Sequence, residues 1–249
     1  MSIETQLEGL AGGIPHGLGE GVALGTGLAE GYDFYDSALG QVIVTFNPEG
    51  VSSLDIADGF EDRYKERFGR PLIRAEAPKA WSRHIQESIE RGNPGDLPVD
   101  LRSVTEFQRR VLRTTAGIPK GEVRPYGWVA FEIASPKAVR AVGSAVAKNP
   151  IPLIIPCHRV VRSDGHIGNY SLGGPHNKVE LLLHEGARPD LLEELAAHNV
   201  RVRADVSTKT YHHPSCHLVR SATDVLDLKS AGAAEARSLR ACQVCRPHG

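Results

Sequence analysis

The sequence predicts a mixed α/β protein with an α/β N-terminal part, a largely helical central part and a small α/β module at the C-terminus. Three observations predict this organisation. A strand-like run at Gln41–Phe46 precedes an amphipathic, helix-like run at Ile56–Phe68. Two short helical segments joined by a tight turn occupy 126–149. Cysteines and histidines gather in the last 45 or so residues, a segment too short for a self-sufficient core without a staple.

These patterns divide the chain into five parts. Residues 1–30 are rich in glycine and poor in aromatic residues, which predicts a poorly ordered leader. The other expected parts are an α/β domain at 31–96, a helical domain at 97–187, a linker at 188–206 and a C-terminal module at 207–249.

Charge is distributed unevenly along the 249 residues, whose formal net charge is −1. Residues 99–189 carry 13 Lys and Arg against 7 Asp and Glu, whereas residues 1–98 carry 8 against 16. The basic central part therefore favours a surface that faces phosphates. No run is apolar and long enough to span a membrane, and the start lacks a secretory signal. Free thiols suit a reducing compartment, so we expect a cytoplasmic, nucleoid-associated protein.

The segment Ile155–Val160, with the sequence Ile-Pro-Cys-His-Arg-Val, predicts a nucleophile at Cys157. A cysteine reacts as its thiolate, so a base or a positive charge must lie nearby. His158 and Arg159 supply both, although neighbours on an extended strand face opposite sides, so His158 needs a turn or a bridging water to serve the thiol. Glu185, at the end of an apolar helical run, is the candidate that orients His158. The alternatives are a buried structural cysteine and an ordinary helix-terminal carboxylate.

Tyr126–Ile133 and a second helix from Pro136 to the stop at Pro150 predict a helix-turn-helix. Ser135 is a suitable N-cap, and proline suits the first helical position. The second helix is made largely of small residues, which allows close approach to a DNA groove. The alternative is a plain helical hairpin packed in the core.

Several motifs in a fixed order together resemble the O6-alkylguanine-DNA alkyltransferases. Asn149–Val161 resembles their active-site signature, Phe107–Val111 with Ile118–Val123 resembles the start of their catalytic domain, and Leu182–Gly186 resembles its end. The resemblance covers roughly residues 97–187. It implies a ribonuclease H-like N-terminal domain and a winged-helix-like catalytic domain that repairs DNA by taking an alkyl group onto its own cysteine.

The resemblance also implies roles for individual residues. Cys157 is the alkyl acceptor, His158 takes the thiol proton through a water, and Glu185 holds the imidazole. Tyr126 gives a proton to the departing guanine. Asn149 lies at the joint between the helix-turn-helix and the active-site strand.

The target base must leave the duplex before it can react. The resemblance places Arg140 in the gap left in the base stack, with a phosphate contact as the alternative. The Val160 backbone, Tyr170 and Ser171 line the guanine pocket, and Lys178 lies near the reactive site. The thioether product is stable, so each molecule acts once. No soluble cofactor is expected, the partner is duplex DNA bearing O6-alkylguanine, and the protein is expected to be a monomer.

Cys242 and Cys245 form a Cys-x2-Cys half-site for a metal ion, and Cys216 supplies a third thiolate. His212, His213 or His217 is the fourth ligand, and a reduced cluster without metal is the alternative. The segment resembles the metal-binding module of Ada-type DNA repair proteins, which implies a structural zinc with His212 as ligand. There His212 replaces a methyl-accepting cysteine, so no phosphotriester repair is expected. Basic residues could let this module touch DNA, with Lys209, Arg220, Arg240 and Arg246 beside Tyr211 as candidates.

Three other functions compete with DNA repair. A transcriptional regulator could use alkylation of Cys157 as its signal. A lesion-binding protein would have an inert Cys157. A cysteine hydrolase would turn over many times, which a single-turnover stoichiometry would exclude.

Overall fold

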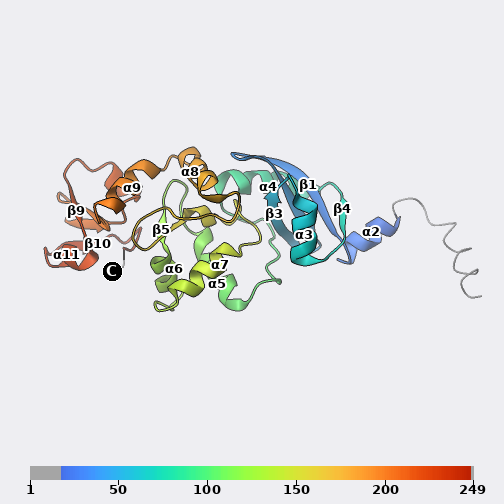
Figure 1. The fold of residues 1–249 in the computed structure, drawn as a ribbon, viewed down its shortest axis with the longest axis horizontal. Helices are drawn as coiled ribbons and strands as arrows, with labels where there is room; N and C mark the ends of the chain where they lie inside the picture. Colours follow the sequence, from blue (N-terminus) through green and yellow to red (C-terminus); the bar gives the residue numbers. More distant parts are fainter. Residues whose placement is uncertain (1–17, 248–249) are drawn as a thin grey trace, which may run out of the picture.

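The computed structural model describes residues 18–247, and the chain runs from an N-terminal sheet through a helical centre to a C-terminal module (Figure 1). The sheet end and the module end lie at opposite extremes of the long axis, with the helical centre between them. The architecture is mixed α/β, as the sequence predicts.

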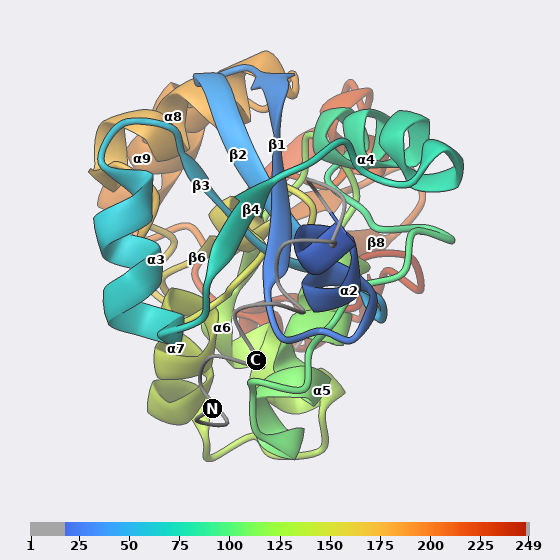
Figure 2. The ribbon, with the colours of Figure 1, turned by 90° about the vertical axis from the view of Figure 1, so that its right-hand side faces the viewer.

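The N-terminal domain is a four-stranded sheet with helices on both faces (Figure 2). Its strand order is β3-β2-β1-β4, antiparallel except for the parallel pair β1 and β4. Its elements are α2 (Leu18–Gly25), β1 (Glu30–Ser37), β2 (Gly40–Asn47), β3 (Gly50–Ile56), α3 (Phe60–Phe68), β4 (Leu72–Arg74) and α4 (Lys79–Arg91).

Alternation along β2 explains the two layers of helices. Val42 and Val44 point into the main core with Ile85 of α4, whereas Ile43 points to the other face and packs against Phe60 and Tyr64 of α3. The sequence predicted β2 at Gln41–Phe46, and this prediction is confirmed.

Two N-terminal predictions need correction. The helix expected to begin at Ile56 begins at Phe60, because Ile56 ends β3 and Gly59 has a left-handed backbone at φ 62°. The poorly ordered leader was expected to reach residue 30, but Leu18–Gly25 form α2 and β1 begins at Glu30. The rest of the expected leader, residues 1–17, lies outside the described residues.

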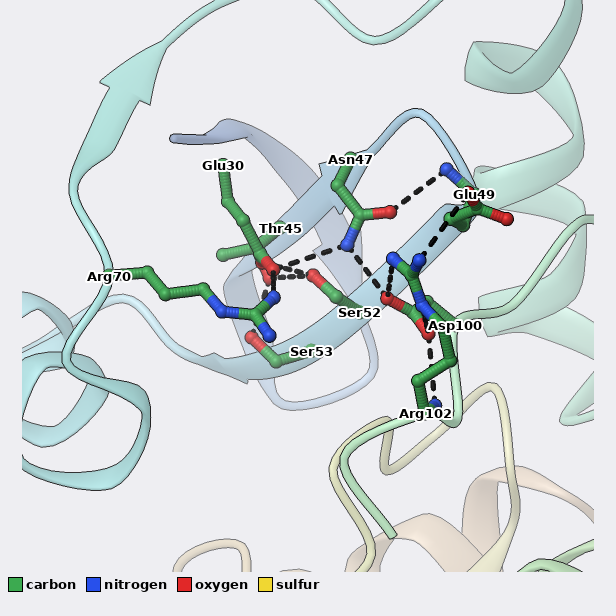
Figure 3. Close-up of polar contacts among 9 residues, drawn as sticks. All are labelled: Glu30, Thr45, Asn47, Glu49, Ser52, Ser53, Arg70, Asp100 and Arg102. Atoms are coloured by element: carbon green, nitrogen blue, oxygen red, sulfur yellow. Dashed lines mark hydrogen bonds and ion pairs between the residues drawn. The ribbon is translucent and has the colours of Figure 1, made fainter. Parts of the chain in front are cut away.

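A buried polar network ties the sheet to the segment that leads into the central domain (Figure 3). The Asn47 amide donates to Glu30 at 3.2 Å and to Asp100 at 2.9 Å, and so bridges two buried carboxylates. Arg70 pairs with Glu30 at 2.6 Å, and Arg102 pairs with Asp100 at 2.9 Å. Each carboxylate thus has a cationic partner, which offsets the cost of burying it.

The central domain carries the helices that the sequence predicted to form a pair. Its elements are α5 (Glu106–Ala116), β5 (Arg124–Pro125), α6 (Tyr126–Glu132), α7 (Val139–Ala147), the 3₁₀ turn η1 (Cys157–Arg159), β6 (Val160–Val161) and α8 (Gly174–His184). The short strands β5 and β6 pair in parallel, with Arg124 opposite Val160. This pairing places the start of α6 beside the segment that follows Cys157.

The helix at Tyr126–Ile133 is confirmed by α6, but the start of the next helix was predicted wrongly. α7 begins at Val139 rather than Pro136. Ala134 has a positive φ of 53°, and the Ala138 N–H donates to the Ser135 carbonyl. Ser135 therefore belongs to a separate turn between the helices and does not cap α7.

The C-terminal module contains a second four-stranded sheet of order β10-β8-β7-β9. Its elements, with the helix that precedes them, are α9 (Pro189–Ala197), β7 (Val202–Asp205), β8 (Thr210–His212), α10 (His217–Arg220), β9 (Val225–Leu228), α11 (Ala231–Glu235) and β10 (Arg240–Ala241). Residues 188–206 are therefore not a linker: they form α9 and a central strand of this sheet. The helix α11 is short: Ser230 caps its start, and Ser238, with a positive φ, lies just beyond its end.

None of the helices in the described part of the chain is long and apolar enough to cross a membrane.

Candidate active site

Cys157 lies at the start of η1, where it is 3% exposed. The chain reaches it from α7 through a buried apolar segment, Ile151–Ile155, and leaves it through β6. The turn that His158 needs in order to serve the thiol is therefore present, formed by Cys157 and the two residues after it.

Asn149 holds the thiol in place. Its Nδ2 donates to the Cys157 sulfur at 3.2 Å and to the Ile155 carbonyl at 2.8 Å, while its Oδ1 accepts from the Ile151 N–H at 3.1 Å. A single buried amide thus fixes the loop and stabilises negative charge on the sulfur. Asn149 lies just after α7, at the joint that the sequence indicated.

The side chains of His158 and Glu185, the expected base and its orienting group, contact each other. His158 Nε2 donates to Glu185 Oε1 at 2.8 Å, which leaves Nδ1 as the proton-accepting nitrogen of the neutral ring. Among the described residues, the buried Nδ1 has no hydrogen-bond partner. Glu185 follows the last residue of α8, so the end of that helix sets the orientation of the imidazole.

Arg159 has a role that the sequence analysis missed. It was expected only as a positive charge, yet it is 1% exposed and joins three parts of the chain. Its guanidinium donates to Glu185 and to the backbone carbonyls of Arg91, Gly92 and Ile118. It therefore connects the active site to the end of α4 in the N-terminal domain. The only sequence signal for this role was the position of Arg159, two residues after Cys157.

The ionisation of the site follows from burial and its partners. Burial raises the pKa of Cys157, opposed by the hydrogen bond from Asn149 and the positive charge of Lys178. Burial lowers the pKa of His158, which keeps the ring neutral and able to take a proton. Burial alone would raise the pKa of Glu185, but hydrogen bonds from His158 and Arg159 lower it to about 2. These shifts favour a neutral thiol, a neutral imidazole and an ionised carboxylate.

Lys178 is a buried lysine that binds backbone carbonyls after the Cys157 turn. It is 1% exposed, and its ammonium donates to the carbonyls of Val160 and Ile167 at 2.7 Å each and to that of Asn169 at 3.4 Å. Burial lowers its pKa to about 8. Its positive charge acts on Cys157, which agrees with a position near the reactive site, and its ammonium fixes the Val160 backbone.

Two tyrosines lie near the thiol. Tyr126, the first residue of α6, is half-buried, and burial together with the nearby Cys157 raises its pKa. Tyr170 is buried, its pKa is raised for the same two reasons, and its ring stands edge-on to His158 at 6.1 Å. Both remain protonated at neutral pH. Ser171, next to Tyr170, is exposed at the edge of a cavity that also reaches Asn149.

Arg140 lies apart from this group. It is exposed on the first turn of α7, while Val142, Ala145 and Val146 bury the opposite side of that helix. Its charge is available to a partner outside the chain.

The C-terminal module brings together the predicted metal ligands. The ligand atoms of His212, Cys216, Cys242 and Cys245 all lie within 4.8 Å of one another, and all four residues are buried. A hydrogen bond from Cys245 lowers the pKa of Cys216, which favours the thiolate that metals bind. Of the three histidines left open by spacing, His212 is the one in this set of four.

Most of the module residues considered for DNA contact serve other purposes. Tyr211 is buried and donates to Glu235 at 2.9 Å. Arg220 donates to the Gly186 carbonyl, and Arg246 pairs with Glu132 at 2.9 Å. Of the five residues that the sequence offered for DNA contact, Lys209, in a turn, and Arg240, on β10, remain as candidates.

Known proteins with similar sequences are, by their names, methyltransferases of methylated DNA that involve a protein cysteine. Residues 106–187 match the family described as "6-O-methylguanine DNA methyltransferase, DNA binding domain". The chain is 37% identical over 158 residues to the methylated-DNA–protein-cysteine methyltransferase of Methanosarcina barkeri, and the alignment covers 62% of this chain and 96% of that protein. The chain belongs to the methylated-DNA–protein-cysteine methyltransferase family.

Two other proteins, one of them with a solved structure, are similar to this chain. The bifunctional transcriptional activator/DNA repair enzyme Ada of Escherichia coli is 36% identical over 167 residues, covering 65% of this chain. The match spans only 47% of Ada. The Mycobacterium tuberculosis OGT, solved in complex with DNA, superposes with a TM-score of 0.52 at 30% identity, covering 65% of this chain and 98% of that one.

Proposed function

We propose that this protein repairs DNA by transferring the alkyl group of O6-alkylguanine to Cys157, once per molecule. The observation that carries the proposal is the chain of contacts from Asn149 to the Cys157 sulfur and from His158 to Glu185. This is the arrangement of nucleophile, base and orienting group that an activated thiol needs. The family membership supports the same reaction.

The reaction forms one bond and breaks one. The Cys157 sulfur bonds to the alkyl carbon as the bond from that carbon to guanine O6 breaks. The thiol proton passes to His158, through a water, and Tyr126 gives a proton to the guanine ring, which makes guanine a better leaving group. The proton held by His158 then returns to Tyr126 through solvent, so the net products are an S-alkylcysteine and unmodified guanine, with one proton moved from the thiol to guanine. No cofactor takes part.

DNA recognition is assigned to α6 and α7. We infer that they act as a helix-turn-helix within a winged-helix-like domain, and that the N-terminal domain has the ribonuclease H-like fold of the family. The small residues on α7 suit the narrow minor groove. Exposed Arg140 on this helix would fill the space left when the alkylated nucleotide is flipped out. The Val160 backbone, Tyr170 and Ser171 would then line the guanine pocket.

The C-terminal set of ligands is proposed to hold a structural zinc ion. Three thiolates and one imidazole are a donor set that zinc prefers in structural sites. The buried Nδ1 of His212 has no hydrogen-bond partner among the described residues, as expected of an imidazole that binds a metal ion. Zinc bound there by His212, Cys216, Cys242 and Cys245 would supply stability rather than chemistry. A histidine at position 212 cannot accept a methyl group as a thiolate does, so phosphotriester repair is not proposed.

The oligomeric state, the partner and the compartment of the protein are also inferred. We infer a monomer that acts on duplex DNA in the cytoplasm, in association with the nucleoid. The excess of basic residues over 99–189 supports DNA as the partner.

The test is single-turnover transfer from a duplex that carries one O6-methylguanine, read by intact mass and peptide mapping. One methyl group per protein on the Cys157 peptide supports the proposal. Cys157→Ser is the control, and it should bind the duplex but gain no mass. Tight binding without transfer by the wild-type protein would indicate a lesion-binding protein, and repeated turnover would indicate a hydrolase.

A further inference from the structure

The loop formed by residues 121–126, here called the site loop, touches the active site at three places. The Gly121 N–H points to Glu185 Oε2 at 3.4 Å. Gly121 also has a φ of +77°, and a Cβ there would lie 2.8 Å from the Glu185 carbonyl, so the loop packs closely on the end of α8. Arg124 pairs with Val160 in the short parallel sheet. The loop ends at Tyr126, the proposed proton donor.

The C-terminal module holds the middle of this loop. The Ser215 hydroxyl accepts from the Val123 N–H at 2.9 Å and donates to the Val123 carbonyl at 3.0 Å. One side chain thus satisfies both backbone groups of a buried residue, as a neighbouring strand would do. Ser215 is itself only 4% exposed, so water does not compete for these bonds.

A charged contact lies beside this one. The His217 backbone N–H and its ring Nδ1 both donate to Glu122 Oε1, at 3.1 and 2.6 Å. The other Glu122 oxygen pairs with Arg124 at 2.6 Å. Glu122 and Arg124 are 1% and 2% exposed, so the pair lies inside the protein at the contact between module and loop.

The residues that make these contacts flank a metal ligand. Ser215 and His217 stand on either side of Cys216, so the backbone shape that presents them to the site loop is the shape that holds Cys216 in the ligand set. The second half-site does the same for α6. Arg246, next to Cys245, pairs with Glu132 and lies 5.8 Å from the centre of the Trp128 ring.

We propose that Ser215 is a positioning residue for alkyl transfer: through Val123 it holds the site loop, and with it Glu185 and Tyr126, in the reactive arrangement. The metal-stapled module is then part of the alkyl-transfer machinery, and not only an appended domain. The inference rests on the proposed function. Ser215 would act on the rate through the positions of other groups, because small displacements of catalytic groups slow a reaction even when every group is present.

The experiment measures benzylation of Cys157 by free O6-benzylguanine, because this probe does not depend on DNA contacts. Ser215→Ala in the full-length, zinc-loaded protein should lower the maximal rate constant by about three- to tenfold, with the half-saturating concentration of the probe less affected. Zinc content, measured by mass spectrometry of the native protein, should stay at the wild-type value. Ser215→Thr, which keeps the hydroxyl, should recover most of the rate.

Ser230→Ala is the matched control. Ser230 is an exposed serine of the same module that caps α11 by accepting from the Ala233 N–H. Unlike Ser215, its hydroxyl makes no hydrogen bond to the site loop among the described residues. It should react at the wild-type rate. If Ser215→Ala lowers the melting temperature below that of the assay, His217→Ala, at a half-exposed side chain, replaces it and should also slow the reaction.

The outcomes separate the two proposals. If the wild-type protein gains no benzyl group on Cys157, the proposed function fails and this inference fails with it. If the wild type reacts and Ser215→Ala matches its rate, only the positioning role is overturned. A threonine variant as slow as the alanine variant also counts against it, because the hydroxyl would not be the cause.

Discussion

The guanidinium of Arg159 and the carboxylate of Glu185 form a buried, two-pronged ion pair in the active site. Arg159 Nε lies 2.9 Å from one carboxylate oxygen, and a terminal nitrogen lies 2.7 Å from the other. The two side chains are 1% and 7% exposed. The same carboxylate accepts from His158, so one acidic group both neutralises the arginine and orients the proposed base.

Removal of that negative charge should destabilise the protein. Glu185→Gln leaves Arg159 buried without a counter-charge, and it should lower the free energy of unfolding by about 3 to 5 kcal/mol. Urea unfolding at neutral pH measures the loss. Glu180→Gln, at a half-exposed carboxylate on the same helix, is the control and should change it by less than about 0.5 kcal/mol.

The same carboxylate predicts part of the acid sensitivity. Its pKa falls from 4.5 to about 2 on folding, so the ionised form stabilises the native state fully above pH 4.5. This stability, about 3 kcal/mol, is lost as pH falls from 4.5 through 2. Unfolding curves collected across that range should converge for wild type and Glu185→Gln. A constant difference down to pH 2 would contradict the assignment.

Asn149 should affect reactivity through the sulfur. Asn149→Asp keeps the shape but replaces the donor with a carboxylate, which disfavours the thiolate of Cys157. The rate of alkylation by O6-benzylguanine should fall by about tenfold or more. Asn199→Asp, at an exposed site with positive φ, should leave the rate unchanged. Equal rates for wild type and Asn149→Asp would show that the amide does not stabilise the thiolate.

Arg140 should matter only for duplex substrates. Arg140→Ala should slow repair of O6-methylguanine in a duplex by about tenfold or more, because extrusion of the base costs a few kcal/mol that the arginine helps to offset. The reaction with free O6-benzylguanine should change by less than about twofold. Arg113→Ala, at an exposed arginine on α5, controls for general loss of positive charge. Equal losses on both substrates would exclude a role in base flipping.

Replacement of a metal ligand should unfold the module. Cys242→Ser should lower bound zinc from one equivalent towards none and lower the melting temperature, because the free energy of zinc binding contributes to folding. Native mass spectrometry and thermal melting measure the two effects. An unchanged zinc content in both Cys242→Ser and Cys245→Ser would remove the site.

One error in the sequence predictions has a local cause and another depends on strand pairing. α7 begins three residues later than expected, because Ala134 adopts a left-handed backbone and Ser135 enters a turn. The expected linker is ordered because Val202–Asp205 pairs with strands on both sides. A four-residue strand at the centre of a small sheet leaves little trace in sequence, since its neighbours come from 210–212 and 225–228.

The sequence by itself determined which residues are candidates for the chemistry. The Cys-His-Arg motif, the asparagine before it, the glutamate at the end of an apolar helical run and the Cys-x2-Cys pair are local motifs that residue type and spacing reveal. Only the tertiary structure decided which of these groups meet. Arg159 reaches carbonyls more than 60 residues away, Lys178 turns inward to Val160, and Ser215 reaches Val123 across 92 residues. Such contacts depend on how whole elements pack, and no local pattern encodes the distance between two segments far apart in the chain.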